Sequence, residues 1–459
     1  MAFWHTDKVS PDHLALVDDR GQTLRWGELT DRVQKLAETI PPRTLVFIFC
    51  KNQCDTIIGY LACLKQNAVA LMLDSELNDA MVKSLIDTYH PSYLWREEHG
   101  TFRLHATGLT PFQLHDDLAL LMTTSGSTGS SKLVRLSQRN LESNATSIAN
   151  YLAIDSKERG LASLPLNYVY GLSIVNSHLK AGATLLLTSA SVMQREFWTF
   201  VRDERATSLA GVPYTWEMLK KLRFMRMDLP DMRTLTQAGG KLAPALVKEF
   251  TDYADQHGKR FVVMYGAAEA TSRMAWLAPE LAQHKSSTIG TPIPGGEFIL
   301  LDENGDIITT PDVDGELVYK GENVALGYAE RGCDLALGDT FQGILHTGDI
   351  ARVDTDGFYS IVGRKKRFLK IFGNRLGMDE METLLKTAFP DLNCACDGRD
   401  DLVCIFITDA AYESAVKHYA AAKSQLHHSA FRVITLDEIP KNAAGKTIYP
   451  KLKDYVPSV

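Results

Sequence analysis

The chain has 459 residues, 45% of them hydrophobic and 23% charged, as in a soluble globular protein of roughly two to four domains. Its net charge of -7 gives no electrostatic basis for nucleic-acid binding. The first residues do not resemble a signal peptide, the apolar runs are too short to span a bilayer, and the seven cysteines form no His/Cys cluster. We therefore expect a cytoplasmic protein with reduced, mostly buried cysteines.

Helical and strand patterns alternate through the first two-thirds of the chain. This alternation predicts α/β layers. The expected strands are residues 68–73, 118–122, 183–187 and 260–265, and the expected helices are residues 55–66 and 140–152.

Beyond residue 289 the sequence favours short strands, because Gly, Asp and Pro become frequent between alternating apolar residues. A tight turn at residues 354–357 should join two strands. A compact terminal domain is expected from residue 364 onward. The strands expected in this part are 297–301, 315–319, 350–353, 358–362, 403–407 and 431–434, with a helix at 378–389.

The stretch TTSGSTGSSK, residues 123–132, directly follows the expected strand 118–122. Glycines allow backbone N–H groups to approach an anion, and the hydroxyls and the lysine add donors and charge. The stretch is therefore a candidate phosphate-binding loop. A polar surface loop is the alternative, and the spacing of a Walker A loop is absent.

Further motifs follow in a fixed order: YGAAE at 265–269, HTGD at 346–349, GRKKRFLKIFGNR at 363–375 and PKNAAGK at 440–446. Together with the Ser/Thr/Gly loop, this set resembles the acyl-adenylate-forming superfamily, which includes acyl-CoA synthetases, adenylation domains of nonribosomal peptide synthetases and firefly luciferase. The resemblance runs from residue 24 to residue 446.

The resemblance implies an α/β fold with a large multi-layer N-terminal domain, residues 1–363, and a small mobile α+β C-terminal domain, residues 364–459. The larger domain would hold two α/β subdomains and a β-rich layer. The hinge would lie near Lys366, although Lys366 could equally be one more member of the basic run at 364–367.

The implied activity is that of an ATP-dependent ligase. It would convert a carboxylic acid into acyl-AMP, release pyrophosphate, and pass the acyl group to the thiol of CoA or of a carrier-protein phosphopantetheine, as a monomer or homodimer without nucleic acid. Three alternatives remain: an amide synthetase, a luciferase-like oxidoreductase and a non-catalytic nucleotide-binding relative.

The resemblance also implies roles for single residues. Lys446 would bridge the attacking carboxylate and the α-phosphate, Asp349 would accept the ribose hydroxyls, and Glu269 would ligate Mg²⁺. Lys446 and Glu269 are thus the catalytic candidates. The nucleotide-binding candidates are Thr124, Ser125, Gly126, Ser127, Thr128, Gly129, Lys132, Gly239, Gly240, Tyr265 (near the adenine, or simply a buried tyrosine), Gly266, Ala267, Ala268, Asp349 and Arg364.

Tyr168, Gly171 and Val212 are the candidates for the acyl pocket. The surrounding residues are mostly apolar and lack the aspartate that binds an α-amino group, so an aliphatic, alicyclic or aromatic acid is expected rather than an amino acid.

Three positions depart from the family's pattern. Ser131 and Leu133 replace the usual proline and glycine of the phosphate loop, and Ala268 replaces a threonine that contacts the α-phosphate. The lost hydroxyl would cost about 0.5–1.5 kcal/mol. Thr271 or Ser272 could compensate for it.

Overall fold

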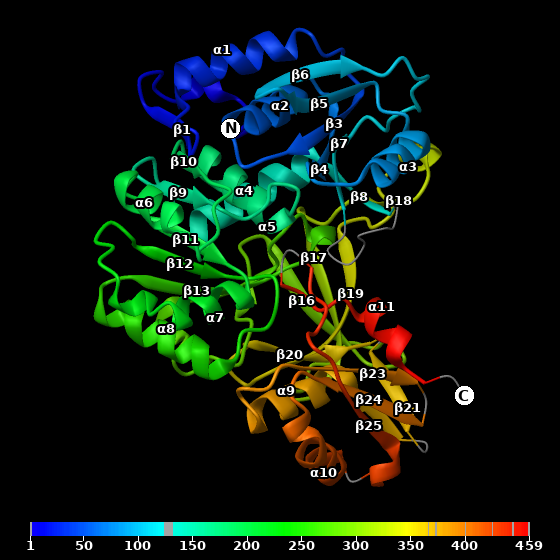
Figure 1. The fold of residues 1–459 in the computed structure, drawn as a ribbon. Coiled ribbons are helices and arrows are strands. Elements are labelled where there is room, and N and C mark those ends of the chain that lie inside the picture. The colour runs from blue at the N-terminus through cyan, green and yellow to red at the C-terminus, as the bar shows by residue number, and fades with distance from the viewer. Residues whose placement is uncertain are drawn as a thin grey trace. The chain divides into compact units, whose positions relative to one another are not determined.

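The computed structural model describes residues 2–123, 132–365, 367–371, 374–399, 401–424, 426–442 and 445–457. The chain divides into two compact units, one of Met1–Glu297 with Tyr319–Leu345 and one of Phe298–Val318 with His346–Val459 (Figure 1). Much of the β-rich stretch beyond residue 297 thus groups with the C-terminal residues. The functional division at residue 363 stays a prediction.

The first unit contains a sheet of nine strands. They are β1 (Leu14–Asp18), β2 (Thr23–Arg25), β9 (Arg159–Ala162), β10 (Thr184–Leu187), β11 (Ser208–Gly211), β12 (Thr234–Gln237), β13 (Arg260–Tyr265), β14 (Ala275–Leu277) and β15 (Thr291–Pro292). Their order is β15-β14-β13-β12-β11-β9-β10-β1-β2. Because β13, β12, β11, β9, β10 and β1 are parallel, their carboxyl ends lie at one edge, the edge where α/β proteins bind ligands.

A second sheet of the first unit has seven strands in the order β18-β8-β7-β4-β3-β5-β6. They are β3 (Leu45–Cys50), β4 (Val69–Asp74), β5 (Tyr93–Glu98), β6 (Thr101–Ala106), β7 (Leu118–Thr123), β8 (Leu133–Ser137) and β18 (Gly327–Ala329). Strand β8 was not predicted from the sequence; it pairs antiparallel with β7 and lies between the polar loop and the following helix.

The helices of the first unit cover both faces of these sheets. They are α1 (Trp26–Ala37), α2 (Cys54–Lys65), α3 (Asp79–Tyr89), α4 (Gln138–Tyr151), α5 (Val169–Lys180), α6 (Arg195–Asp203), α7 (Pro213–Lys221) and α8 (Pro244–Gln256), with 3₁₀ turns η1 (Thr6–Lys8), η2 (Phe224–Arg226), η3 (Ala268–Ala270), η4 (Pro279–Leu281) and η5 (Gly332–Ala336).

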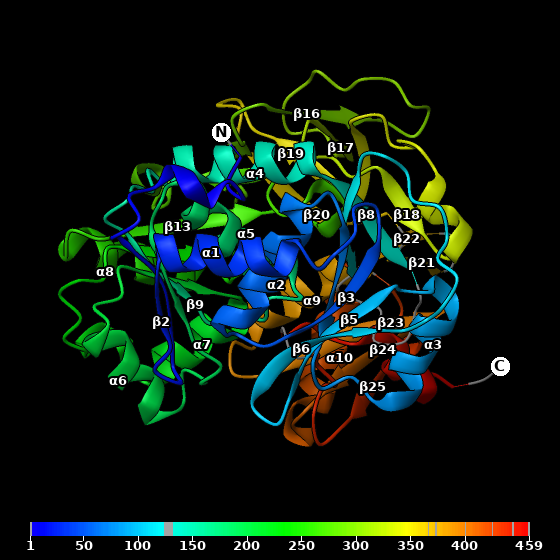
Figure 2. The same cartoon turned by 90° about the horizontal axis from the view of Figure 1, so that it is seen from above.

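One buried cluster joins α1, α2, α4 and α5 to strands of both sheets, and Figure 2 shows α1 beside α2. Alternate residues of β3 and β4 point to the opposite face, where they pack with α3. The central strands are therefore buried on both faces, as their continuous apolar runs predict.

Arg135 of β8 is fully buried and holds the segment around β18 in place. Its Nε donates to the carbonyl of Tyr328 at 2.9 Å, and its Nη2 donates to those of Leu326 and Gly338, both at 3.0 Å. A further bond joins Nη1 to the carbonyl of Leu337. The guanidinium therefore fixes the backbone on either side of Tyr328.

Replacing Arg135 with methionine should lower the free energy of unfolding by about 3 kcal/mol or more, because several buried carbonyls lose a charged donor. Chemical denaturation followed by circular dichroism measures this change. Arg139→Met is the control, since Arg139 lies on the surface and its one ion pair, with Glu322, is exposed. Equal losses in the two variants would contradict the structural role of Arg135.

The second unit is built on shorter sheets. Strands β16 (Gly296–Leu301), β17 (Gly315–Gly321), β19 (Ile344–Val353) and β20 (Tyr359–Arg364) form one sheet in that order, residues 298–318 and 346–364 of which belong to this unit. A hairpin of β21 (Phe368–Ile371) and β22 (Asn374–Gly377) precedes a sheet of β23 (Cys394–Arg399), β24 (Leu402–Ile407) and β25 (Phe431–Thr435). The helices are α9 (Met378–Ala388), α10 (Glu413–Ser424) and α11 (Tyr449–Leu452), with 3₁₀ turns η6 (Ala410–Tyr412), η7 (His428–Ala430) and η8 (Lys453–Tyr455).

Strand β24 separates two small cores of this unit. Val403 and Ile405 pack with α9 and α10, whereas Cys404 and Phe406 face Leu452 of α11. The alternation follows from the two-residue period of a strand. The segment that carries α11 therefore has its own apolar anchor in the second unit.

All seven cysteines lie in the described part of the chain, and all are free. Six are buried and Cys333 is exposed. Burial raises the pKa of Cys394 to about 11, and it raises the pKa of Cys396 well above its ordinary value. The buried cysteines thus act as small apolar core residues, as expected. None of the helices in the described ranges has the length and apolar character needed to cross a bilayer.

Candidate active site

The YGAAE motif forms the turn that follows β13. Tyr265 is the last residue of the strand, and a Cβ atom on Gly266 would come within 1.7 Å of the carbonyl oxygen of Ser272. Only glycine permits this close approach. The chain then enters η3, which presents the half-buried carboxylate of Glu269 beyond the carboxyl end of β13.

Tyr328 of β18 connects Glu269 with Lys132. Its hydroxyl donates to Oε1 of Glu269 at 2.8 Å, and Nζ of Lys132 lies 3.6 Å from the centre of its ring. Burial raises the pKa of Tyr328, and the negative charge of Glu269 raises it further. The tyrosine therefore stays a neutral donor that orients the carboxylate. Tyr328 thus contacts a carboxylate through its hydroxyl and a lysine through the face of its ring.

The chemistry of Glu269 suits magnesium, which prefers hard oxygen ligands. Its Oε2 makes no hydrogen bond to any described residue. No group of three or more His, Cys, Asp and Glu side chains that could hold a metal occurs within the described ranges. An Mg²⁺ ion at Glu269 would therefore take its remaining ligands from phosphate oxygens and water.

Two hydroxyls near Ala268 form hydrogen bonds within the protein. Thr271 Oγ1 donates to the carbonyl of Asn323 at 2.7 Å, in a buried position. The hydroxyl of Ser272 accepts a bond of 2.9 Å from Arg273 Nη1, and Ser272 is also buried. The Thr271 hydroxyl uses its proton in this bond, whereas that of Ser272 acts as an acceptor, so compensation by either residue stays a prediction.

Most of the candidate phosphate loop cannot be placed. Thr124, Ser125, Gly126, Ser127, Thr128 and Gly129 lie outside the described residues, as does Ser131. Its two flanks are described: Thr123 ends β7, and Lys132 precedes β8. Nζ of Lys132 also lies 3.8 Å from Oε1 of the exposed Glu330. The roles of the loop residues stay predictions.

Three of the predicted pocket residues converge at the carboxyl edge of the nine-stranded sheet. A Cβ atom on Gly239 would lie 2.6 Å from the hydroxyl of Tyr168 and 3.1 Å from Cγ1 of Val212. Gly239 also has a φ of +85°, which favours glycine. Tyr168 and Val212 immediately precede α5 and α7, and Gly239 follows β12. Residues from three segments far apart in the sequence thus meet at one site.

The other two glycines have structural explanations of their own. A Cβ atom on Gly171 would come within 2.2 Å of the Pro165 carbonyl oxygen, and one on Gly240 would lie 3.1 Å from Cγ of Pro213. The Gly240 carbonyl also accepts a bond from Gln237. The contact at Gly171 requires glycine without any ligand, and the one at Gly240 is tight, so the proposed roles of both residues stay predictions.

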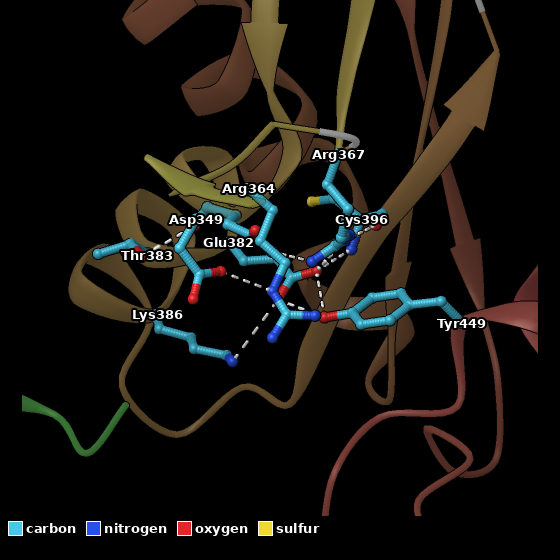
Figure 3. A network of polar contacts seen from close by, with 9 residues as sticks. Asp349, Arg364, Arg367, Glu382, Thr383, Lys386, Cys396 and Tyr449 are labelled. Atoms are coloured by element: carbon cyan, nitrogen blue, oxygen red, sulfur yellow. Dashed lines mark hydrogen bonds and ion pairs between the residues drawn. The ribbon is translucent and has the colours of Figure 1, made fainter. Parts of the chain in front are cut away.

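In the second unit, Asp349 and Arg364 face each other across β19 and β20. Arg364 Nε donates to Oδ1 of Asp349 at 3.1 Å, as Figure 3 shows. Asp349 is 7% exposed and follows Gly348, whose φ is +70°. The HTGD motif thus lies within β19 and presents a paired carboxylate beside an arginine.

Lys446 lies at the end of a hydrogen-bonded turn in the second unit. Its backbone N–H donates to Oδ1 of Asn442 at 2.9 Å, its carbonyl accepts from the Asn442 N–H, and Gly445 has a φ of +73°. Lys441 and Thr447 pair on either side. The backbone of Lys446 is therefore held by hydrogen bonds to Asn442. Lys366, the predicted hinge residue, lies outside the described residues.

A buried ionic network links the segment after Lys446 to α9 (Figure 3). Arg367 Nη2 donates to Oε1 of Glu382 at 2.9 Å, and its guanidinium lies 3.6 Å from the ring centre of Tyr449. The Tyr449 hydroxyl donates to Glu382 at 3.0 Å, and the Cys396 N–H does so at 2.8 Å. Burial lowers the pKa of Arg367, but the charge of Glu382 and the contacts with Glu382 and Tyr449 together raise that pKa above its ordinary value.

We expect Glu382→Gln to lower the free energy of unfolding by about 1–3 kcal/mol, because Arg367 loses the charge of Glu382 and keeps its ion pair with Asp379. Thermal unfolding measures the loss. Lys386→Gln is the matched control: Lys386 Nζ lies 3.9 Å from the same carboxylate, but its side chain is 57% exposed, so a change within about 1 kcal/mol is expected. Equal effects would show that the network does not stabilise this unit.

Four residues of these arrangements were not predicted from the sequence: Tyr328, Arg367, Glu382 and Tyr449. Each contact spans many residues, so no local pattern marks it. The sequence offers one cue to Tyr328, the glycine that precedes it. In the structure Gly327 has a φ of +121°, which favours glycine.

Comparisons with known proteins give a consistent result. The family model described as AMP-binding enzyme matches residues 3–329. Oxalate–CoA ligase of Arabidopsis thaliana is 30% identical over 96% of this chain and 95% of its own length. A 2-succinylbenzoate–CoA ligase of Bacillus pumilus is 26% identical over 98% of this chain and 96% of its own. The o-succinylbenzoate CoA synthetase of Bacillus subtilis, solved with its acyl-adenylate intermediate, superposes with a TM-score of 0.81 at 22% identity, over 99% and 98% of the two chains.

Proposed function

Because the chain belongs to the AMP-binding enzyme family, we propose that it is an ATP-dependent ligase that joins a carboxylic acid to CoA. The carboxylate attacks the α-phosphorus of ATP, which gives acyl-AMP and pyrophosphate. The CoA thiol then attacks the acyl carbon, and AMP leaves. The relatives named as CoA ligases, which align over nearly their full length, support the thiol acceptor.

One observation supports the adenylation step: Tyr328 contacts both Glu269 and Lys132. The carboxylate can hold Mg²⁺, and the lysine supplies positive charge at the end of the Ser/Thr/Gly stretch. Neutralising a triphosphate is the main requirement of chemistry at phosphorus. Mg²⁺ at Glu269 would supply that charge. A relative of this fold has been solved with ATP and magnesium, at a TM-score of 0.80.

The remaining predicted residues have separate tasks in this proposal. Asp349 binds the ribose hydroxyls, with Arg364 holding one of its oxygens. Tyr265 lies near the adenine. Lys446 contacts the reacting carboxylate and the α-phosphate in adenylation only, and a pivot at Lys366 then removes it. A proline at Lys366 should spare adenylation and slow thiol transfer.

The test is pyrophosphate release from ATP and Mg²⁺ with a panel of carboxylic acids, followed by mass analysis after addition of CoA, a phosphopantetheine-loaded carrier protein or an amine. We expect acid-dependent pyrophosphate release and an acyl-CoA product. Product with the amine alone would identify an amide synthetase, and oxygen uptake with light emission would identify a luciferase-like enzyme. No pyrophosphate with any acid would contradict the proposal.

A further inference from the structure

Arg273 is a buried cation for which the structure shows no anion. The residue is 2% exposed and lies four positions after Glu269. Its Nε contacts the sulfur of Met264 at 3.3 Å, and its Nη1 donates to the Ser272 hydroxyl at 2.9 Å. No described carboxylate forms an ion pair with it. A buried charge of this kind is costly unless something compensates it.

The position of the guanidinium is well defined. Its carbon lies 4.0 Å from the ring centre of Tyr170, and the Arg273 carbonyl accepts bonds from Asn144 at 3.1 Å and Asn323 at 2.9 Å. Burial raises the pKa of Tyr151 to about 12, and the nearby charge of Arg273 opposes this rise. Several elements therefore hold the arginine, but all of these neighbours are neutral.

Arg273 lines a cavity of about 30 Å³ inside the first unit. A cavity of this size holds about two water molecules, or a group as small as a carboxylate. Its polar lining includes the hydroxyls of Ser177 and Thr236. Glu158 also lines it, but that carboxylate is already compensated by the Thr207 hydroxyl and by Arg233 at 3.5 Å. The guanidinium is thus the uncompensated charge of the cavity.

Neighbouring residues link the cavity to the candidate acyl pocket. Ala210 of β11 and Thr236 of β12 line the cavity, and each lies two residues before a residue at the carboxyl edge of the sheet, Val212 and Ala238 respectively. Two residues along a strand correspond to roughly 7 Å. Tyr168 lies beside Gly239 in the candidate acyl pocket. Its ring centre is 6.3 Å from that of Tyr170, and the Arg273 guanidinium stacks on the Tyr170 ring.

From this arrangement we infer that the acid activated by this protein carries a second carboxylate, held by Arg273 at the far end of the acyl pocket. The inference rests on the proposed function and narrows it to dicarboxylic acids. The apolar walls accommodate the middle of the substrate, and the guanidinium binds its far end through charge-assisted hydrogen bonds. The reacting carboxylate remains near Gly239.

The test compares dicarboxylates from succinate to suberate with straight-chain monocarboxylates of the same lengths, and isophthalate with benzoate. We expect kcat/KM for pyrophosphate release to be at least tenfold higher with the best dicarboxylate than with its monocarboxylate. In Arg273→Met the dicarboxylate should lose about ten- to a hundredfold, while the monocarboxylate loses less or gains. Arg135→Met, which removes the other fully buried arginine, should leave the ratio unchanged.

A binding measurement separates this inference from the proposed function. With a non-hydrolysable ATP analogue and Mg²⁺ present, the best dicarboxylate should raise the melting temperature of the wild-type protein but not that of Arg273→Met. If no acid releases pyrophosphate, the ligase proposal fails, but this shift still tests the site. A preference for monocarboxylates, or an equal effect of Arg273→Met on both acids, would overturn the inference and leave Arg273 as a structural residue.

Discussion

Lys446→Ala is expected to slow pyrophosphate formation by about a hundred- to a thousandfold, the effect of removing one preorganised charge from a reaction centre. Transfer of the acyl group from synthetic acyl-AMP to CoA should change by no more than a few fold. The reason is that the lysine compensates charge only while the carboxylate approaches the α-phosphate. The turn formed by Asn442, Gly445 and Lys446 fixes the base of this side chain, so alanine removes the charge without disturbing the backbone.

The two half-reactions are measured separately, with pyrophosphate release for the first and CoA consumption for the second. Lys451→Ala is the control, because Lys451 is exposed on α11, a few residues further along the same segment. It should keep both rates within about twofold. If Lys446→Ala slowed both half-reactions equally, the pivot at Lys366 would lose its main support.

The second large effect is expected for Glu269→Gln. The amide keeps the shape and can still accept the bond from Tyr328, but it loses the charge that attracts Mg²⁺. We expect adenylation to fall by about a hundredfold at a fixed low Mg²⁺ concentration. Raising the Mg²⁺ concentration should recover part of the loss, because the defect lies in metal affinity.

Two further variants show whether the charge of Glu269 is responsible. Glu330→Gln removes a carboxylate that lies 3.8 Å from Lys132 but is 65% exposed, and it should leave the Mg²⁺ dependence unchanged. Tyr328→Phe removes a single hydrogen bond, worth about 0.5–1.5 kcal/mol, so a loss of up to about tenfold is expected. An unchanged Mg²⁺ titration in Glu269→Gln would remove Glu269 as the metal ligand.

Much of the fold could be predicted from sequence where the pattern is local and long. Strand β13 coincides with the expected residues 260–265, and helices α2, α4 and α9 lie within two residues of the expected bounds. The capping box of Ser137 and Asn140 explains the start of α4, since each side chain satisfies a backbone N–H of the other.

Strand β8 was not predicted because Arg135 interrupts its apolar run. A buried arginine in a strand is recognisable only when its partners are known, and these lie nearly two hundred residues further along the chain. The grouping of Phe298–Val318 with the C-terminal residues was not predicted for the same reason, because it depends on contacts between residues far apart in the sequence. Pairing between distant strands depends on packing, which local propensity does not encode.

For the site, the sequence identified residue types but not their neighbours. Tyr168 and Val212 were predicted for the acyl pocket and Gly239 for nucleotide binding, and the structure shows that all three are neighbours. Tyr328 and Arg273 were absent from the predicted site because their importance comes from what surrounds them: a carboxylate in one case and a small buried cavity in the other. Sequence motifs indicate the chemistry that a family shares, whereas the roles of residues such as Tyr328 and Arg273 depend on their neighbours in the fold.

The burial of six of the seven cysteines has a practical consequence. Cys333 is the exposed thiol and belongs to the first unit, so a maleimide fluorophore should attach there alone in the native protein. A second dye on Lys451→Cys would then place one label on each unit. Energy transfer between the two dyes would report directly on whether the units change their separation when ATP, the acid and CoA are added in turn.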